Sequence, residues 1–128
     1  MENKKTILIV EDEISMLNAL RDKFTREGFE VLEAKNGEEG LEIALRDHPD
    51  LILLDIVMPK MDGMTMLKRI RADAWGKDVK VIILTNLSDN EKTAAALAQG
   101  SYDYLVKSDW KIEDVVAKVK ERLGVNNS

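Results

Sequence analysis

Short apolar runs alternate with stretches of helical periodicity along the chain, and this alternation limits the fold more than any other feature. Five runs have the length and composition of β-strands, and they lie at residues 7–10, 30–34, 51–54, 81–84 and 102–106. A segment with apolar residues every three or four positions follows each run, as in a helix with one buried face. These segments lie at residues 14–24, 41–45, 64–70, 91–99 and 112–123. Strict alternation of strands and helices predicts an α/β fold with a parallel sheet covered on both faces.

The polarity of the runs predicts the order of the strands in the sheet. Runs 7–10, 51–54 and 81–84 are uniformly apolar, which suits strands that helices cover on both faces. The other two runs are mixed, so we place them at the edges. This gives a doubly wound (βα)5 domain with a five-stranded sheet in the order 2-1-3-4-5. One domain is expected at 128 residues, and we assign residues 1–124 to it and residues 125–128 to a short C-terminal tail.

Composition excludes several classes of function. The 19 basic and 24 acidic residues give a net charge of −5, so the chain lacks the basic surplus of a protein that binds nucleic acid directly. The absence of cysteine excludes disulfides, thiolate nucleophiles and cysteine-based metal centres. The single histidine, His48, is interpreted as a surface or helix-end residue and not as a phosphodonor. No apolar run approaches the roughly 18 residues of a membrane span, so we expect a soluble, cytoplasmic protein without a membrane partner.

Polar residues end four of the predicted strands. In a doubly wound sheet, ligands bind outside the carboxyl ends of the strands, where the strand order reverses. The first strand in the chain ends in two acids and the third in one, and these two strands are neighbours in the predicted order. The candidate site residues at this edge are Glu11, Asp12, Asp55, Thr85 and Lys107.

Three acids at one edge predict a metal site. Two carboxylates about 4 Å apart repel by about 4 kcal/mol at an effective dielectric constant near 20, so all three stay ionised only beside a compensating cation. A carboxylate-rich, all-oxygen site suits Mg²⁺, which keeps several waters and takes few protein ligands. We expect Asp12 and Asp55 to be direct ligands, Glu11 to act through water, and the backbone carbonyl of Val57 to complete the set.

The same edge predicts phosphoryl chemistry. A carboxylate accepts a phosphoryl group once a metal polarises that group, and an acyl phosphate forms. Asp55 is the best candidate for the acceptor because it ends the central strand. Lys107 is expected to contact one phosphoryl oxygen as a point charge, and the hydroxyl of Thr85 to donate to another.

Several short motifs resemble the receiver domain of two-component response regulators, which has the CheY-like version of the flavodoxin topology. Any one of them is weak evidence, but together they occur in the right order on the right strand ends. The resemblance covers residues 5–123. The motifs are Val10-Glu11-Asp12, Leu54-Asp55-Ile56-Val57-Met58-Pro59 followed by Met61-Asp62-Gly63, Leu84-Thr85, and Tyr102-Asp103-Tyr104-Leu105-Val106-Lys107.

The resemblance implies a signalling switch with intrinsic phosphotransfer and autodephosphorylation chemistry, and not a conventional enzyme. It implies that Asp55 receives a phosphoryl group from a sensor histidine kinase or a histidine phosphotransfer protein, with Mg²⁺ held by Glu11, Asp12 and Asp55. It also implies a switch through Thr85 and Tyr104. That switch would alter the surface formed by the fourth predicted helix, the fifth strand and the fifth helix, to which an unidentified downstream protein would bind.

The chain departs from the family pattern at three places. Ser108 follows Lys107 where the family usually has proline, so we expect a trans bond and a re-routed loop. Asn86 follows the switch threonine where a small residue is usual, which would alter dephosphorylation. The fourth predicted helix, residues 91–99, lacks the arginine of the family's commonest dimer face.

Three other functions compete with this interpretation. The first is a pseudo-receiver that binds partners without using the acidic pocket, which Asn86 and Ser108 make conceivable. The second is a Mg²⁺ phosphatase of the haloacid dehalogenase type, but that family requires an acid where Val57 stands. The third is a flavodoxin-like FMN carrier, in which the acids at positions 11–13 would repel the phosphate.

Overall fold

The computed structural model describes residues 4–55, 60–85, 103–106 and 111–125, with the backbone alone for residues 85 and 103–106. The strands in these residues are β1 (Thr6–Val10), β2 (Glu30–Ala34), β3 (Leu51–Asp55), β4 (Lys80–Thr85) and β5 (Asp103–Val106). The helices are α1 (Ile14–Arg26), α2 (Gly37–Asp47), α3 (Gly63–Ala72) and α5 (Ile112–Leu123).

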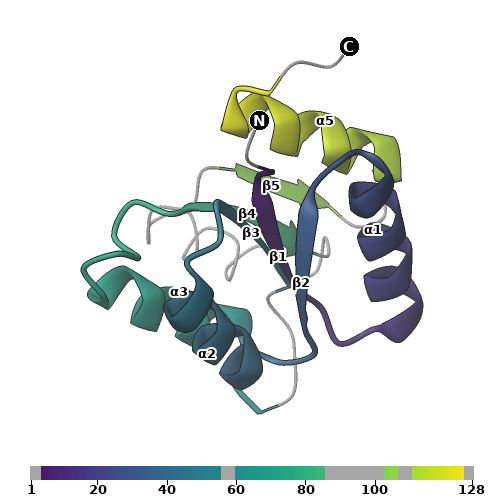
Figure 1. Cartoon of the computed structure of the whole chain (residues 1–128). Coiled ribbons are helices and arrows are strands. Elements are labelled where there is room, and N and C mark those ends of the chain that lie inside the picture. The colour runs from purple at the N-terminus through teal and green to yellow at the C-terminus, as the bar shows by residue number, and fades with distance from the viewer. Residues whose placement is uncertain (1–3, 56–59, 86–102, 107–110, 126–128) are drawn as a thin grey trace.

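The strands form one parallel sheet in the order β2-β1-β3-β4-β5 (Figure 1). The apolar strands β1 and β3 lie in its interior, and the more polar β2, whose side chains are mostly half-buried, lies at an edge. The predicted α/β class and parallel sheet are therefore confirmed. The helix predicted at residues 91–99 lies outside the described residues, so the complete (βα)5 arrangement stays a prediction.

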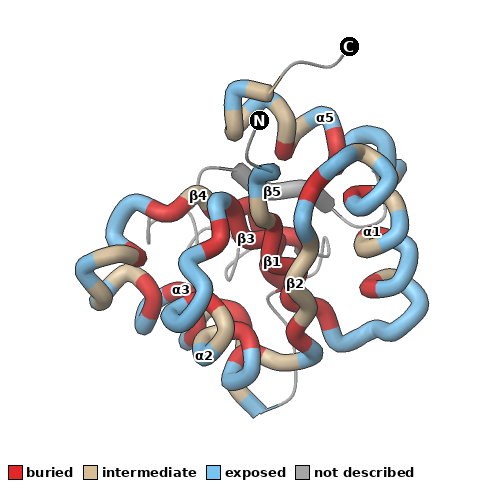
Figure 2. The backbone as a smooth tube through the Cα atoms, viewed as in Figure 1, coloured by how far each residue is buried: buried red, intermediate tan, exposed pale blue. Residues whose placement is uncertain are grey.

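Helices cover both faces of the sheet and create two cores, one on each side. Alternate strand residues point to opposite faces, so Leu8 and Val10 join the core under α2 and α3, whereas Ile7 and Ile9 join the core under α1 and α5. Figure 2 shows the buried residues concentrated along the central strands and on the inner sides of the helices. Burying one large apolar side chain contributes about 1.5–3 kcal/mol, so the two cores fix the positions of the strand ends.

Capping residues define both ends of α2. The side chain of Asn36 caps α2 by accepting a hydrogen bond from the amide of Glu39, at 2.8 Å. His48 ends the same helix in the left-handed conformation, is exposed, and stacks on Trp75 with ring centroids 4.5 Å apart. This agrees with the interpretation of His48 as a helix-end surface residue.

In the described part of the chain, no helix combines the length and apolarity required to span a membrane.

An ion pair joins the C-terminal end of α1 to α5, the two helices that cover the same face of the sheet. The Lys120 ammonium group donates to the Glu27 carboxylate at 2.7 Å, and Lys23 lies 3.3 Å from the same carboxylate. The hydrogen bond from Lys120, followed by that from Lys23, lowers the pKa of Glu27 below its ordinary value of 4.5. A carboxyl with a lowered pKa in the folded state stabilises the fold above its unfolded-state pKa, and this contribution is lost as the pH falls through its folded-state pKa.

We predict a pH-dependent coupling between these two helices. A double-mutant cycle of Glu27→Gln and Lys120→Met, measured by urea unfolding, should give a favourable coupling free energy at neutral pH. The coupling should disappear well below pH 4.5, where the Glu27 carboxyl becomes protonated in the folded state. Glu38→Gln, which removes an exposed carboxylate from α2, serves as the control. A coupling that persists unchanged in acid would show that packing, and not charge, joins the two side chains.

Candidate functional site

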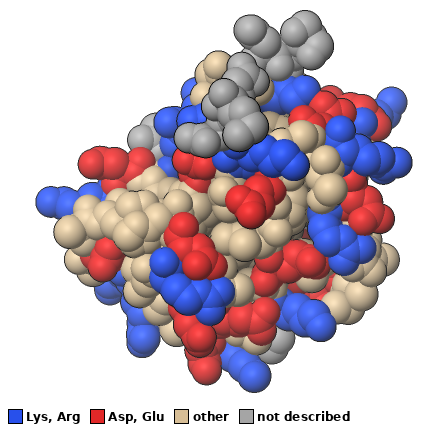
Figure 3. All heavy atoms as spheres, in the orientation of Figure 1, with Lys and Arg blue, Asp and Glu red and all other residues tan. Residues whose placement is uncertain are grey.

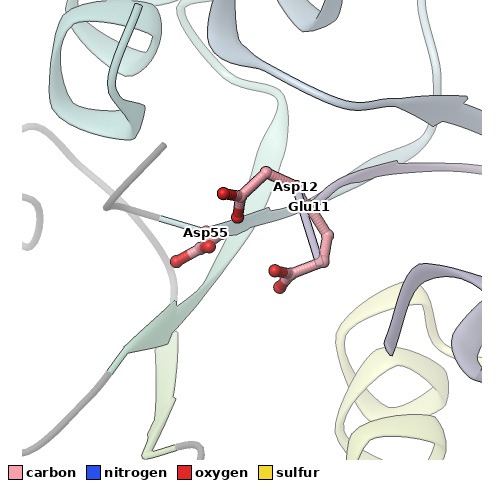
Figure 4. Close-up of side chains that lie close together, drawn as sticks. All are labelled: Glu11, Asp12 and Asp55. Carbon is pink, nitrogen blue, oxygen red and sulfur yellow. The ribbon is translucent and has the colours of Figure 1, made fainter. Parts of the chain in front are cut away.

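Three carboxylates meet at the edge of the sheet where β1 and β3 end (Figure 4). Glu11 and Asp12 directly follow β1, and Asp55 is the last residue of β3. The two strands are adjacent and parallel, with Val10 paired to Leu54, so their carboxyl ends lie side by side. One oxygen atom from each of the three side chains lies within 4.8 Å of the others. The structure therefore brings together all three acids that the sequence singled out.

The three acids differ in their exposure to solvent. Glu11 is fully buried and Asp55 is only 4% exposed, whereas Asp12 is exposed. The backbone holds Glu11 in place, because its amide donates to the carbonyl of Ala34 at 3.0 Å and its carboxylate accepts from the amide of Glu13 at 3.2 Å. Asp12 thus forms the solvent side of the cluster, and Glu11 and Asp55 form its inner wall.

The donor set fits a divalent cation. Two unit charges 4.8 Å apart repel by about 3.5 kcal/mol at an effective dielectric constant near 20. Partial burial reduces screening by solvent and salt, so a cation between the carboxylates relieves a considerable repulsion. Hard oxygen ligands with room for water are the surroundings that Mg²⁺ prefers.

The remaining candidate residues are described in part or not at all. Thr85 ends β4, which lies beside β3 with Leu84 paired to Asp55, so the Thr85 backbone reaches the same edge of the sheet. Tyr104 lies on β5 and is paired with Ile83. For both residues only the backbone is described. Four further candidate residues and one segment lie outside the described residues, namely Val57, Asn86, Lys107, Ser108 and residues 91–99.

One contact at this edge was not predicted from the sequence. The amide of Gly37, at the start of α2, donates to the carbonyl of Met61 at 3.0 Å, just before α3 begins. The pair Asn36-Gly37 indicates a turn, but no feature of the sequence identifies the segment that packs against this turn.

Curated relatives align with most of the chain. A probable transcriptional regulator named ycf27 from Cyanophora paradoxa is 41% identical over 82% of the chain and 43% of the relative. A DNA-binding dual master transcriptional regulator, RpaA of a Synechocystis strain, is 32% identical over 91% of the chain and 48% of the relative. The chain therefore spans about half the length of these curated relatives.

These relatives correct one expectation from the sequence. Excluding nucleic acid as a direct partner was wrong, since a relative that matches most of the chain is named a DNA-binding regulator. The exclusion relied on the net charge of −5. Figure 3 shows acidic and basic side chains intermingled on one face of the described residues. Such a charge balance characterises the surface of one domain and says nothing of the half of the relatives that this chain does not match.

A solved structure with a bound metal is also similar. The receiver domain of a sensor histidine kinase from Pseudomonas aeruginosa superposes with a TM-score of 0.86 at 27% identity, covering 95% of this chain and 99% of that one. In that structure a magnesium ion is coordinated in the active site cleft.

A family match covers most of the chain and includes the acidic cluster. The profile of the response regulator receiver domain family matches residues 7–120, which contain Glu11, Asp12 and Asp55. The resemblance inferred from the sequence motifs is thereby confirmed at the level of the family. The chain belongs to the response regulator receiver domain family, whose members are signalling proteins of two-component systems.

Proposed function

We propose that this domain is a phosphorylation-operated switch in which Asp55 accepts a phosphoryl group in a Mg²⁺-dependent reaction. The observation that carries the proposal is the convergence of Glu11, Asp12 and Asp55 within 4.8 Å at the end of the sheet. Membership of the receiver family supports a sensor histidine kinase or a histidine phosphotransfer protein as the donor.

The acids would divide the task of holding the metal. Asp12 and Asp55 would coordinate Mg²⁺ directly, and the backbone carbonyl of Val57 would supply a further ligand. Burial of Glu11, and the hydrogen bond that its carboxylate accepts from the Glu13 amide, support an indirect role through water. When bound, Mg²⁺ neutralises the clustered carboxylates and draws charge from the phosphoryl oxygens.

The side chains of the domain would carry the transfer itself. An oxygen of the Asp55 carboxylate forms a bond to phosphorus, and the bond between phosphorus and the donor atom breaks, which leaves an acyl phosphate on Asp55. Lys107 would pair with one phosphoryl oxygen, and the hydroxyl of Thr85 would donate to another. The position of Thr85 at the end of β4, beside the strand that carries Asp55, supports this role.

We predict that intact-mass measurement after incubation with Mg²⁺ and acetyl phosphate will show one added phosphoryl group on the wild type. The group should be absent from Asp55→Asn and from wild type treated with EDTA. Asp22→Asn, which alters an exposed acid on α1, should gain the phosphoryl group as the wild type does. Labelling of Asp55→Asn would show that another residue is the acceptor, and failure of the wild type to label would favour the pseudo-receiver.

We also propose that phosphorylation is transmitted through Thr85 and Tyr104. The residues lie on adjacent parallel strands, where Ile83 pairs with Tyr104 and Thr85 pairs with Val106. Movement of Thr85 towards a phosphoryl group on Asp55 would free space for the Tyr104 ring, altering the surface of residues 91–99, 102–106 and 112–123. The phosphoryl group shifts this equilibrium only by interacting differently with the two states.

We predict that Thr85→Ala uncouples the two residues. Beryllofluoride with Mg²⁺, a mimic of the phosphoryl group, should change the NMR shifts of the Tyr104 ring and amide in the wild type. The change should be smaller in Thr85→Ala, because we expect a coupling free energy of about 1–3 kcal/mol between the phosphoryl site and Tyr104. In Thr25→Ala, a control substitution on the exposed face of α1, the change should equal that of the wild type. An equal response in Thr85→Ala would show that the signal leaves the site by another route.

The domain bounds remain part of the proposal. We propose that residues 1–124 form the receiver domain and residues 125–128 a short tail. Gly124 supports this boundary, because it follows α5 with φ = 69° and its amide donates to the carbonyl of Glu121, which closes the helix.

A further inference from the structure

The turn between β2 and α2 connects the two segments that carry the acids. On one side, the carbonyl of Ala34 accepts from the amide of Glu11 at 3.0 Å. On the other side, the amide of Gly37 donates to the carbonyl of Met61 at 3.0 Å, in the connection that leads from Asp55 to α3. Residues 34–37 thus form a bridge of two backbone hydrogen bonds between the segment after β1 and the segment after β3.

The close approach at Gly37 depends on the absence of a side chain. A Cβ atom at this position would overlap the carbonyl oxygen of Met61 and lie 2.8 Å from its carbonyl carbon. Gly37 does not have a positive φ, so its backbone conformation is open to other residues. Packing alone therefore demands glycine here, and the obstructing atoms belong to the backbone, which cannot rotate away as a side chain can.

The segment at Met61 is held from several directions. Lys60 has a left-handed conformation with φ = 66°, and the carboxylate of Asp62 caps α3 by accepting from the amide of Thr65 at 2.8 Å. The side chain of Met61 packs against the core under α2 and α3. Only four residues, 56–59, separate Asp55 from Lys60. Because Met61 stands six residues after Asp55 in the chain, we expect a displacement of Met61 to act on Asp55.

We propose that Gly37 is a positioning residue for the acidic cluster. Its amide holds the carbonyl of Met61, and its missing side chain lets the start of α2 lie against the connection that follows Asp55. This inference rests on the proposed function, because it assigns Gly37 a role in the geometry that Mg²⁺ and the phosphoryl group require. A misplacement of about 1 Å by a substitution far from the reacting atoms costs about 100-fold in rate.

The test compares Gly37→Ala with Gly40→Ala, a matched substitution one turn later in the same helix. Both glycines are buried, and both substitutions raise the intrinsic helix propensity. A Cβ at Gly40 would lie 2.9 Å from the sulfur of Met66 and 3.0 Å from the Cγ2 atom of Val10, both of which are side-chain atoms. The long side chain of Met66 can move aside, so Gly40→Ala crowds side-chain atoms of the core and leaves the backbone of Met61 uncrowded.

Three quantities are measured for each variant and for the wild type: the dissociation constant for Mg²⁺, the rate of labelling by acetyl phosphate, and the free energy of unfolding in urea. Gly37→Ala should weaken Mg²⁺ binding and slow labelling about tenfold or more, because the misplaced segment carries Asp55, whereas Gly40→Ala should leave both close to wild type. Unchanged binding in Gly37→Ala, or equal losses in the two variants, would overturn the positioning role. If the wild type itself neither binds Mg²⁺ nor labels, the proposed function fails and this inference fails with it.

A measurement on the wild type decides the matter if Gly37→Ala does not fold. Coupling between two sites is reciprocal, so Mg²⁺ should slow hydrogen exchange of the Gly37 amide. The amide of Gly40, which donates to the carbonyl of Asn36 at 2.9 Å within the same helix start, is the internal reference. Selective protection of Gly37 supports the proposal. Equal protection of both amides, or none at Gly37, contradicts it.

Discussion

Mutual repulsion of three carboxylates at one edge of the sheet is the constraint on which the site depends. Glu11 is fully buried and Asp55 is nearly so. One carboxylate oxygen of each lies within 4.8 Å of the other and of a carboxylate oxygen of Asp12. Apolar packing holds them there, because residues 7–10 and 51–54 of the adjacent strands are completely buried. The two cores stabilise strand ends that electrostatics alone would separate, which leaves the edge prepared for a cation.

Backbone groups donate the hydrogen bonds that hold Glu11 and the start of α2 at this edge. Glu11 is fixed through its own amide and through that of Glu13, and the start of α2 lies against Met61 through a backbone hydrogen bond. The two bonds between backbone groups do not depend on a rotamer, and the bond from the Glu13 amide holds the Glu11 side chain in one rotamer. Glu11 is therefore held at the end of a buried strand, which suits a site with small tolerances in distance.

Periodicity and strand-end chemistry predicted most of this arrangement, and the gaps have physical causes. Uniformly apolar strands belong in the interior of a parallel sheet, so the adjacency of β1 and β3, and with it the cluster of Glu11, Asp12 and Asp55, followed from the pattern. The bond from Gly37 to Met61 did not, because a contact between the first residue of a helix and a loop leaves no periodic signal. The exclusion of nucleic acid failed because the net charge describes only these 128 residues, whereas the curated relatives are about twice as long.

The sign of the stability change in Asp12→Asn tests the central claim most directly. Asp12 is exposed, so the substitution removes a charge without creating a cavity. In EDTA, Asp12→Asn should raise the free energy of unfolding above that of the wild type, because repulsion within the cluster is relieved. Added Mg²⁺ should stabilise the wild type through binding to the folded state and should stabilise Asp12→Asn much less. Glu42→Gln, which removes an exposed charge from α2, should show neither effect. If Asp12→Asn is no more stable than wild type in EDTA, and Mg²⁺ stabilises both proteins equally, the three carboxylates do not form a cation site.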